Sequence, residues 1–592
     1  MVARHGPSLL ATGGWLCFVG RTIMRLRGSL TFVLYDDGMI SMTYARTWAR
    51  TGALTWFPGA PKVEGFSNPL WTAGMALVHL MRIPDRLVGG VVQLVGLGLL
   101  LWCVSSVGQL VTAMGGTAEH RRAARWLSAA FWPMAYWAAI GMEVSAVAAL
   151  MLAFAVSVAL ATEHVEPGGR RTSFARPAVL LTLAVLVRTD ALVLALPFLS
   201  QVVRVHPRRR LLPMLLPAVG LAGTTLARRL YFADWVPNTF RLKGSGVLVW
   251  DQVKSGSSIV VAMICGTLLP IAALAVIGTA RRGSQLRRHD IGRASHVAVG
   301  ITIVYVAWIG GDFMDAGDGH ALGVPDRFMS TAVPFLLPAA ASGLIILRAA
   351  ARRASARMLL TWTVAGTMIA TLMISSARWA WSSRWSHAAA VDPAGIAAVS
   401  HRLMWTALIA TLLAATAAMI GRRRAWVAIV LLGAIVWTNV DLLDRVLIRD
   451  DFAVQRERAR VGDALRQAVA PGTTVAVAGA GSIVYFSGLP AVDELGKSDR
   501  RIAKGPIEQH PFIAGHSKWD AQYSLVDEAP DLILERWGAG PEIDAQLTAL
   551  GYRALGTIAG VGSSGPLVRP GTELDAVELC RMLSGTYYAC DG

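Results

Sequence analysis

Charged residues are scarce in this chain. Only 16% of its 592 residues are Asp, Glu, Lys or Arg, whereas 54% are hydrophobic. A mean hydropathy of +0.49 is too apolar for a water-soluble globule, so most of the chain must lie in lipid. The sequence also lacks the Walker A, GxSxG and HExxH motifs, which disfavours an ATP-driven pump, a serine hydrolase and a zinc peptidase.

Cysteine is equally sparse, with five residues in the whole chain. Cys17, Cys103 and Cys265 lie within apolar runs, where a thiol behaves as a small hydrophobic group. Cys580 and Cys590 lie in the polar C-terminal tail, where a disulfide in an oxidising compartment and two free thiols both fit the sequence. The histidines form no cluster with metal-ligand spacing, so no zinc site is expected.

Basic residues outnumber acidic ones, with 56 Lys and Arg against 38 Asp and Glu. In a soluble protein the resulting net charge of +18 would suggest a nucleic-acid partner. Here the basic residues form short clusters between apolar runs, a pattern typical of the loops that orient membrane spans. We therefore expect the lipid bilayer as a partner and no nucleic acid.

Thirteen apolar stretches are suitable for membrane spans, each of which needs ~20 residues in a helix. They predict an α-helical polytopic membrane protein. The fifth and sixth stretches are short and are expected to form two tightly turned helices. The thirteen stretches cover residues 8–24, 88–114, 125–141, 143–162, 178–190, 191–204, 211–230, 258–280, 294–311, 328–350, 358–376, 400–420 and 425–443.

Arginine distribution predicts the orientation of these spans. With the N-terminus inside, six loops should be cytoplasmic, and each of them is rich in arginine, as the positive-inside rule requires. We therefore expect a multi-pass protein of the plasma (inner) membrane with a cytoplasmic N-terminus and an extracytoplasmic C-terminal domain. The six loops cover residues 120–125, 170–176, 204–210, 281–293, 352–357 and 422–424.

One apolar segment, residues 66–82, is not counted as a span. Counting it would invert every later loop and place all the arginine clusters outside. We interpret it as an amphipathic helix at the membrane surface, preceded by a similar helix at 39–50, both within a first outer loop at 25–87. Arg21, Arg25 and Arg27 then lie beyond the first span, on the side of the membrane where arginine is disfavoured.

The composition changes near residue 444. Residues 1–444 are assigned to the membrane domain and residues 445–592 to a soluble mixed α/β domain, with a helix near 453–469 and a strand at 473–479. The glycine-rich AGAGS that ends this strand lacks the GxGxxG spacing and the acidic residue of a dinucleotide site. A plain strand-to-helix turn is the better interpretation.

Asp36 and Asp37 open the first outer loop. Two adjacent carboxylates beside an apolar run are costly unless they are hydrated, paired or bound to a cation, so they indicate a functional site. One can act as a general base toward a hydroxyl while the other holds substrate or a cation, and magnesium or manganese is an open alternative there. The structural alternative is a helix N-cap followed by an acidic first turn.

Further polar residues fall on the same predicted outer face. Glu64 and Asn68 lie in PKVEGFSNPLW, a string that suits a sugar or headgroup and would equally suit interfacial anchoring. The cations Lys243, Arg228 and Arg327 suit a lipid-linked phosphate presented from the outer leaflet. A structural ion pair is an equal alternative for Arg188 and Asp190. The remaining outer-face residues include Glu143, Arg229, Asn238 and Asp312.

The motifs resemble one family from end to end. The run YDDGMISMTYARTWARTGALTWFPGAPKVEGFSNPLW at 35–71 is similar to the first outer loop of polyprenyl-phosphate-dependent GT-C glycosyltransferases. The resemblance is closest to the mycobacterial terminal β-(1→2)-arabinofuranosyltransferases and their bacterial relatives. IGMEVS, VPNTFRLK, GGDFM with RFM, YFSGLPAVDELGKSD and GHSKWD resemble later motifs of that group, in the same order.

The resemblance implies a GT-C-like fold and an inverting transfer of a sugar from a polyprenyl phosphate to a cell-envelope glycan. Asp36 and Asp37 correspond to the acidic pair expected to be catalytic, although the sequence does not say which is the base. The soluble domain would bind the acceptor, with His516, Lys518 and Asp520 as candidates, or play a structural role.

Arabinofuranose is the expected sugar, and mannose or another hexose is the alternative within the class. VEGFSNPLW and Thr189 depart from the pattern of the arabinosyltransferases, and these departures bear on the sugar. A flippase for lipid-linked sugar and a non-catalytic envelope assembly factor are alternatives from other classes. Transporters often carry duplicated halves, and none is evident here.

Overall fold

The chain was analysed as a computed structural model. It describes residues 2–163, 173–205, 208–244, 246–280, 289–312, 326–385, 393–443, 446–447, 450–508, 512–555 and 566–584. Cys590 lies outside this part of the chain, as do parts of the arginine-rich loops at 170–176, 204–210 and 281–293.

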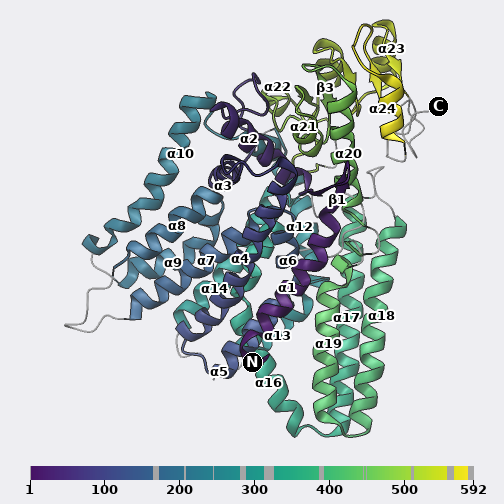
Figure 1. Ribbon diagram of the computed structural model, residues 1–592. Coiled ribbons are helices and arrows are strands. Elements are labelled where there is room, and N and C mark those ends of the chain that lie inside the picture. The colour runs from purple at the N-terminus through teal and green to yellow at the C-terminus, as the bar shows by residue number, and fades with distance from the viewer. Residues whose placement is uncertain are drawn as a thin grey trace.

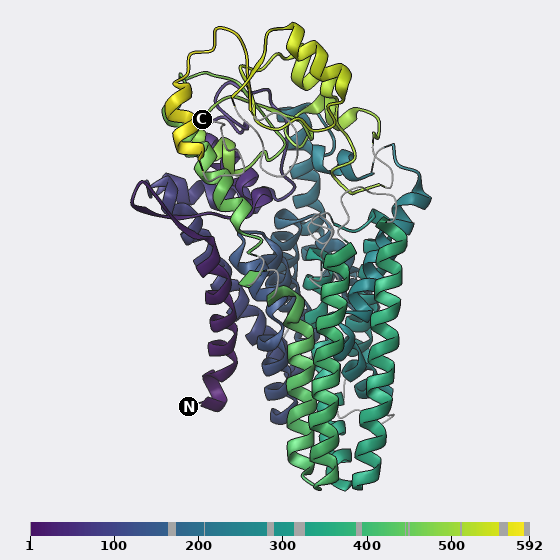
Figure 2. The ribbon, with the colours of Figure 1, turned by 90° about the vertical axis from the view of Figure 1, so that its right-hand side faces the viewer.

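A bundle of long helices carries a mixed α/β part at one end (Figures 1 and 2). The N-terminus lies near the opposite end of the bundle, and α17, α18 and α19 form a sheaf along one side. The bundle contains α1 (Val2–Thr22), α4 (Asp85–Ala113), α5 (Ala118–Ala130), α6 (Trp132–Ala139), α7 (Val144–Glu163), α8 (Ala175–Val187), α9 (Ala191–Val205), the 3₁₀ helix η1 (Arg208–Leu215), α10 (Leu216–Phe232), α11 (Asn238–Gly244), α12 (Val249–Cys265), α13 (Leu269–Ala280), α14 (His289–Ile309), α15 (Arg327–Ala332), the 3₁₀ turn η3 (Val333–Phe335), α16 (Leu337–Arg353), α17 (Ala356–Trp385), α18 (Pro393–Met419) and α19 (Arg423–Leu443).

Every predicted span coincides with helix, but three of them are broken. The stretch 125–141 divides at Phe131 into α5 and α6, and the stretch 258–280 divides at Gly266 into α12 and α13. The stretch 328–350 bends by 55° between η3 and α16. Prolines follow or flank these breaks, because proline lacks the N–H that a helix interior needs. The sequence did not predict a break or bend inside these three stretches.

Within the described residues, five helices are long and apolar enough to cross a membrane, and up to seven if each bent pair is one span. Four shorter apolar helices accompany them. The count of thirteen spans stays a prediction.

Close helix packing in the bundle depends on glycine at one contact. A Cβ added at Gly278 of α13 would lie 2.0 Å from the Ala339 carbonyl oxygen of α16. The reciprocal addition at Gly343 would lie 1.9 Å from the Leu274 carbonyl oxygen. Such small-residue contacts let two membrane helices approach closely, so α13 and α16 form one rigid wall.

Part of the first loop forms a layer between the bundle and the α/β part. The helix expected at 39–50 begins earlier, as α2 (Asp36–Thr51), and the helix expected at 66–82 is α3 (Pro69–Leu80). Met39 and Met42 of α2 pack in a cluster with α4, whereas Ile40 and Tyr44 pack with α20 and α21. The membrane-surface position expected for α2 was wrong, because both of its faces are covered by protein. For α3, which leaves Leu77 and Leu80 exposed, that position stays a prediction.

A β-hairpin that the sequence did not predict precedes α2. β1 (Ile23–Leu26) pairs antiparallel with β2 (Ser29–Phe32). Its turn residue Arg27 donates two hydrogen bonds to the Asp463 carboxylate of α20, with Nε at 2.9 Å from Oδ2. This ion pair gives the turn arginine a carboxylate partner in the α/β part.

The C-terminal part is built on a five-stranded sheet of order β4-β3-β5-β7-β6. β3 pairs in parallel with β4 and β5, and β7 pairs antiparallel with β5 and β6. The elements include α20 (Ala453–Ala468), β3 (Val475–Val477), α21 (Ser482–Ser487), β4 (Ala491–Asp493), α22 (Arg500–Lys504), β5 (Leu532–Ile533), α23 (Pro541–Ala549), β6 (Arg553–Ala554), β7 (Leu567–Val568) and α24 (Ala576–Leu583), with a π-helical turn η5 (Gln522–Asp527). α20 and β3 lie where the sequence predicts a helix and a strand.

Candidate functional site

Asp36 and Asp37 stand side by side in the first turn of α2 but engage different partners. The N-cap of α2 is Tyr35, so neither aspartate caps this helix. Asp36 is buried and accepts backbone N–H groups of Gly481 (3.2 Å) and Ser482 (2.9 Å), where the turn after β3 opens α21. A Cβ at Gly481 would lie 2.2 Å from the Asp36 carbonyl oxygen, so glycine is required there. Asp36 thus holds the α/β part against α2.

Asp37 faces a cluster of cations instead. The Lys497 ammonium donates to its Oδ1 at 2.8 Å, and 27% of the Asp37 side chain is exposed. Burial alone would raise the pKa of Asp37, but the charges of Lys497 and Arg327 hold that pKa well below its usual range. Burial, together with Lys497, lowers the pKa of His516 to about 3. Asp37 is therefore ionised, and His516 neutral, near neutral pH.

Lys497 reaches Asp37 because the turn after β4 is tightly held. The Asp493 carboxylate accepts backbone N–H groups of Leu495 (3.0 Å) and Ser498, which flank the lysine on both sides. Asn238 of α11 donates to the carbonyl oxygens of Gly496 (3.3 Å) and Asp499 (2.9 Å). Sequence reasoning missed Lys497, although it is the lysine of the DELGKSD motif that carried the family resemblance.

Three cations lie close to one aromatic ring in this cluster. The Arg188 and Arg327 guanidinium carbons lie 5.1 and 5.5 Å from the centre of the Phe328 ring, and the Lys243 nitrogen lies 5.9 Å from it. Asp312 accepts from both Lys243 (3.2 Å) and Arg327 (2.9 Å) through the same Oδ1. Two cations thus share one carboxylate, which leaves them able to bind an anion.

Two buried atoms of this cluster have no hydrogen-bond partner among the described residues. They are Nε of Arg327 and Oδ2 of Asp312. Both side chains are nearly inaccessible, at 9% and 3% exposure. A buried donor without a partner is costly, so the free Arg327 Nε points to a polar ligand at this place.

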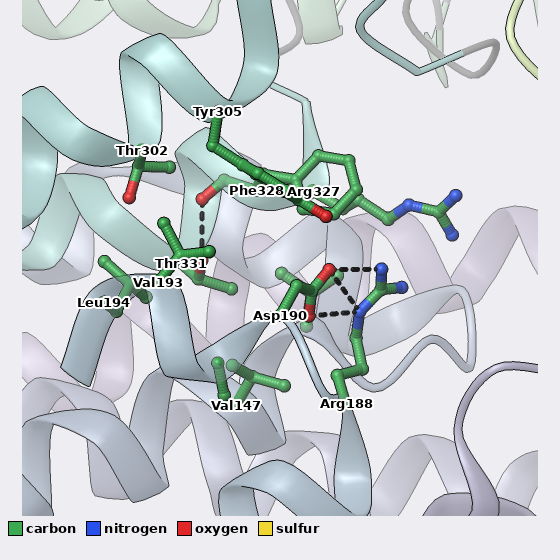
Figure 3. A pocket seen from close by; sticks show the side chains of 12 residues that line it. Val147, Arg188, Asp190, Val193, Leu194, Thr302, Tyr305, Arg327, Phe328 and Thr331 are labelled. Atoms are coloured by element: carbon green, nitrogen blue, oxygen red, sulfur yellow. Dashed lines mark hydrogen bonds and ion pairs between the residues drawn. The ribbon is translucent and has the colours of Figure 1, made fainter. Parts of the chain in front are cut away.

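A second chain of polar contacts fixes Arg188 in the cluster. Ser41 donates to Asn68 (3.0 Å), Asn68 donates to Glu143 (2.8 Å), and Glu143 accepts from Arg188 (2.6 Å). Arg188 also donates to Asp190, and Figure 3 shows its guanidinium facing that carboxylate. The small cavity of Figure 3 is lined by this pair together with Tyr305, Arg327 and Phe328.

The structure brings together most of the residues singled out from the sequence, but not all. Asp37, Lys243, Arg327, Asp312, Arg188, Glu143, Asn68 and His516 belong to the cluster or to its direct supports. Asn238 supports it through the turn of Lys497. Glu64 instead forms a buried ion pair with Arg228.

Two of the expected acceptor-binding residues have local partners in the α/β part. The buried Lys518 ammonium donates to the Ala503 carbonyl oxygen at 3.1 Å. Asp520 accepts the Tyr523 N–H at 2.9 Å and lies 3.4 Å from Arg501. The structure does not bring either side chain to the cation cluster.

A divalent cation bridging Asp36 and Asp37 does not fit these partners. The Asp36 carboxylate is taken by two backbone N–H groups, and the Lys497 ammonium stands where a cation on Asp37 would lie. Within the described ranges, no group of three or more His, Cys, Asp or Glu side chains could hold a metal ion.

The architecture is that of the GT-C membrane fold, and the comparison that shows this is with ArnT. The structure of ArnT from Cupriavidus metallidurans bound to undecaprenyl phosphate matches with a TM-score of 0.56 and 11% identity, over 95% of this chain and 97% of that one. Its apo structure matches with a TM-score of 0.52 and 12% identity, over 96% and 98%. The predicted helical membrane fold of the GT-C type is confirmed. The closer resemblance to arabinofuranosyltransferases stays a prediction.

Other comparisons add little. A family described as "Domain of unknown function (DUF8728)" matches residues 448–572, which belong to the α/β part. No curated protein matches the chain.

Replacing Asp36 should loosen the α/β part. The Asp36→Asn variant keeps one acceptor oxygen and loses the charge, so the free energy of unfolding should fall by about 1–3 kcal/mol, the cost of a weakened buried hydrogen bond. The midpoint of thermal unfolding of the purified protein measures this, with Glu542→Gln at an exposed site of α23 as the charge-matched control. An unchanged midpoint for Asp36→Asn would remove the docking role.

Proposed function

We propose that the chain is a membrane glycosyltransferase that moves a sugar from a polyprenyl phosphate to a glycan acceptor with inversion. The observation that carries the proposal is that Asp37 interacts electrostatically with Arg327 and Lys243, and that the buried Arg327 Nε–H has no hydrogen-bond partner among the described residues. A site of this kind combines a proton acceptor with cations for a departing phosphate. The fold it shares with ArnT, whose structure holds undecaprenyl phosphate, supports the same class.

In this mechanism Asp37 accepts the proton of the acceptor hydroxyl. The hydroxyl oxygen attacks the anomeric carbon, the bond from that carbon to the phosphate oxygen breaks, and the polyprenyl phosphate leaves with the electron pair. Arg327 and Lys243 neutralise the charge that develops on the phosphate. Asp36 acts as a positioning residue, because its oxygens are held by α21.

Lys497 would couple the α/β part to the chemistry. It pairs with Asp37 across the boundary between the two parts, and its own pKa is raised because the carboxylates of Asp37 and Asp36 outweigh the effect of burial. Assembly of the site therefore requires that the α/β part be docked. This gives the C-terminal part a role in the reaction besides acceptor binding.

Removing Lys497 should change the pH dependence of transfer. Burial raises the pKa of Asp37, and the charge of Lys497 lowers it. In Lys497→Met this lowering effect is lost, so the pKa of Asp37 rises and its carboxylate is protonated at a higher pH. The acidic limb of the kcat/KM profile should move toward neutral pH. The matched control is Lys254→Met, at an exposed position of α12. An acidic limb that stays in place would contradict the electrostatic role of Lys497.

The sugar and the acceptor rest on the motif resemblance. We propose arabinofuranose as the sugar, a cell-envelope glycan as the acceptor, and an extracytoplasmic site in the plasma membrane. The test offers polyprenyl-phosphoryl arabinofuranose and polyprenyl-phosphoryl mannose separately to the purified protein with envelope glycan acceptors. Transfer of arabinofuranose alone supports the proposal, whereas transfer of mannose alone keeps the class and replaces the sugar.

A further inference from the structure

At the end of the bundle away from the α/β part lie α5 and the C-terminal end of α16 (Figure 1). A cleft of about 750 Å³ is lined by residues of both helices. Helices α1, α5, α13, α16 and α19 form its sides. One wall is the rigid α13–α16 pair with its glycine contact. Most of the lining is apolar and includes Leu127, Phe131, Ile271, Leu274, Leu344 and Leu431.

The end of this cleft that lies farthest from the α/β part is strongly basic. Five arginines line it, from three helices that are distant in the sequence: Arg122, Arg348, Arg352, Arg423 and Arg424. One acidic residue accompanies them, since Glu119 lies 3.6 Å from Arg348, and both side chains are more than half exposed. The Arg423 guanidinium also donates to the Arg352 carbonyl oxygen at 2.9 Å, which joins α19 to α16 at the rim.

The length of the cleft matches one leaflet. Its lining on α19 runs from Arg423 to Thr438, which corresponds to roughly 22 Å of helix at 1.5 Å per residue. One leaflet, with its headgroup region, spans about 20–22 Å, half of the ~40–45 Å bilayer. A single acyl chain therefore fits along the apolar wall while its headgroup stays at the rim. Trp126, 37% exposed and part of the lining, has the amphipathic ring expected at this depth.

We propose that this cleft binds an anionic phospholipid from the leaflet opposite the α/β part. The phosphate lies among the arginines of α5, α16 and α19, because one guanidinium group can donate two parallel hydrogen bonds to phosphate oxygens. One acyl chain lies against α16 and α19. The membrane supplies this ligand directly, and the proposal does not depend on the glycosyltransferase reaction.

The test uses a triple variant and a matched control. Arg348→Gln, Arg352→Gln and Arg424→Gln are combined in the first protein. Arg121→Gln, Arg353→Gln and Arg422→Gln, at exposed positions of the same region outside the lining, are combined in the second. Both carry the same change in charge. Each protein is placed in phosphatidylcholine nanodiscs with and without phosphatidylglycerol, and native mass spectrometry measures the affinity for the retained lipid.

The lining variant should bind phosphatidylglycerol at least about tenfold more weakly than wild type, and the control less than about twofold more weakly. A third variant, Leu431→Trp, narrows the apolar cleft and should lower retention with every arginine in place. Equal losses in both triple variants would reduce the effect to general surface charge and overturn the proposal. Equal affinity of wild type for phosphatidylcholine would overturn it as well.

Discussion

Asp37→Asn should lower sugar transfer by about 10³-fold, within the range that a positioned general base contributes. The substitution keeps the size of the side chain and one oxygen for Lys497 but removes the group that accepts the hydroxyl proton. Its effect should fall on kcat, because the acceptor and the donor still bind. Steady-state transfer with the purified variant measures kcat and both KM values.

Two comparisons separate this effect from misfolding. Glu542→Gln makes the same chemical change on the exposed surface of α23 and should transfer at the wild-type rate. Asp36→Asn should lower thermal stability more than Asp37→Asn does, because Asp36 holds backbone N–H groups and Asp37 holds an ammonium. Transfer by folded Asp37→Asn at the wild-type rate would exclude Asp37 as the base.

Arg327→Met should lower kcat/KM by about 10²-fold, the usual cost of removing one donor that stabilises developing charge. Arg327 provides a buried guanidinium beside Asp312, and its Nε–H finds no hydrogen-bond partner in the part of the chain that the structure describes. Its loss should slow departure of the phosphate and weaken donor binding together. Transfer assays at varied donor concentration measure both effects.

The matched control for this variant is Arg229→Met. Arg229 is exposed near the end of α10 and packs over the Trp235 ring, away from the cluster. It should leave the donor KM within about twofold of wild type, since exposed surface substitutions seldom cost more than a few tenths of a kcal/mol. Equal effects of Arg229→Met and Arg327→Met would mean that the loss reflects general surface charge, and would remove Arg327 from the phosphate site.

Hydrophobic runs and arginine clusters were sufficient to predict the helical elements, because lipid demands long apolar helices whatever their tertiary contacts. The breaks at Phe131 and Gly266 were not predicted, since a short irregular segment inside the bundle leaves the average hydropathy high. The position of α2 was also missed. Its periodic apolar face is the same whether it lies on lipid or under the α/β part.

In the candidate site, too, some residues could be predicted from the sequence and others could not. Charged residues on one predicted face, such as Lys243 and Arg327, were identified because they are expensive near a membrane. Lys497 was missed because its partner lies 460 positions earlier in the chain, and no local pattern records that contact. Asp36 and Asp37 have different roles because their carboxylates contact different parts of the molecule. Their adjacent positions in the sequence do not predict this difference.

The most direct test of the proposed function is release of polyprenyl phosphate from a polyprenyl-phosphoryl sugar by the purified protein in detergent. Detergent removes the two leaflets, so transport of the lipid cannot be mistaken for transfer. We expect polyprenyl phosphate and glycosylated acceptor to appear together, only when acceptor is present, and to be lost in Asp37→Asn. No release with any polyprenyl-phosphoryl sugar by the folded protein, together with movement of intact lipid-linked sugar across proteoliposome membranes, would contradict the account and favour a flippase.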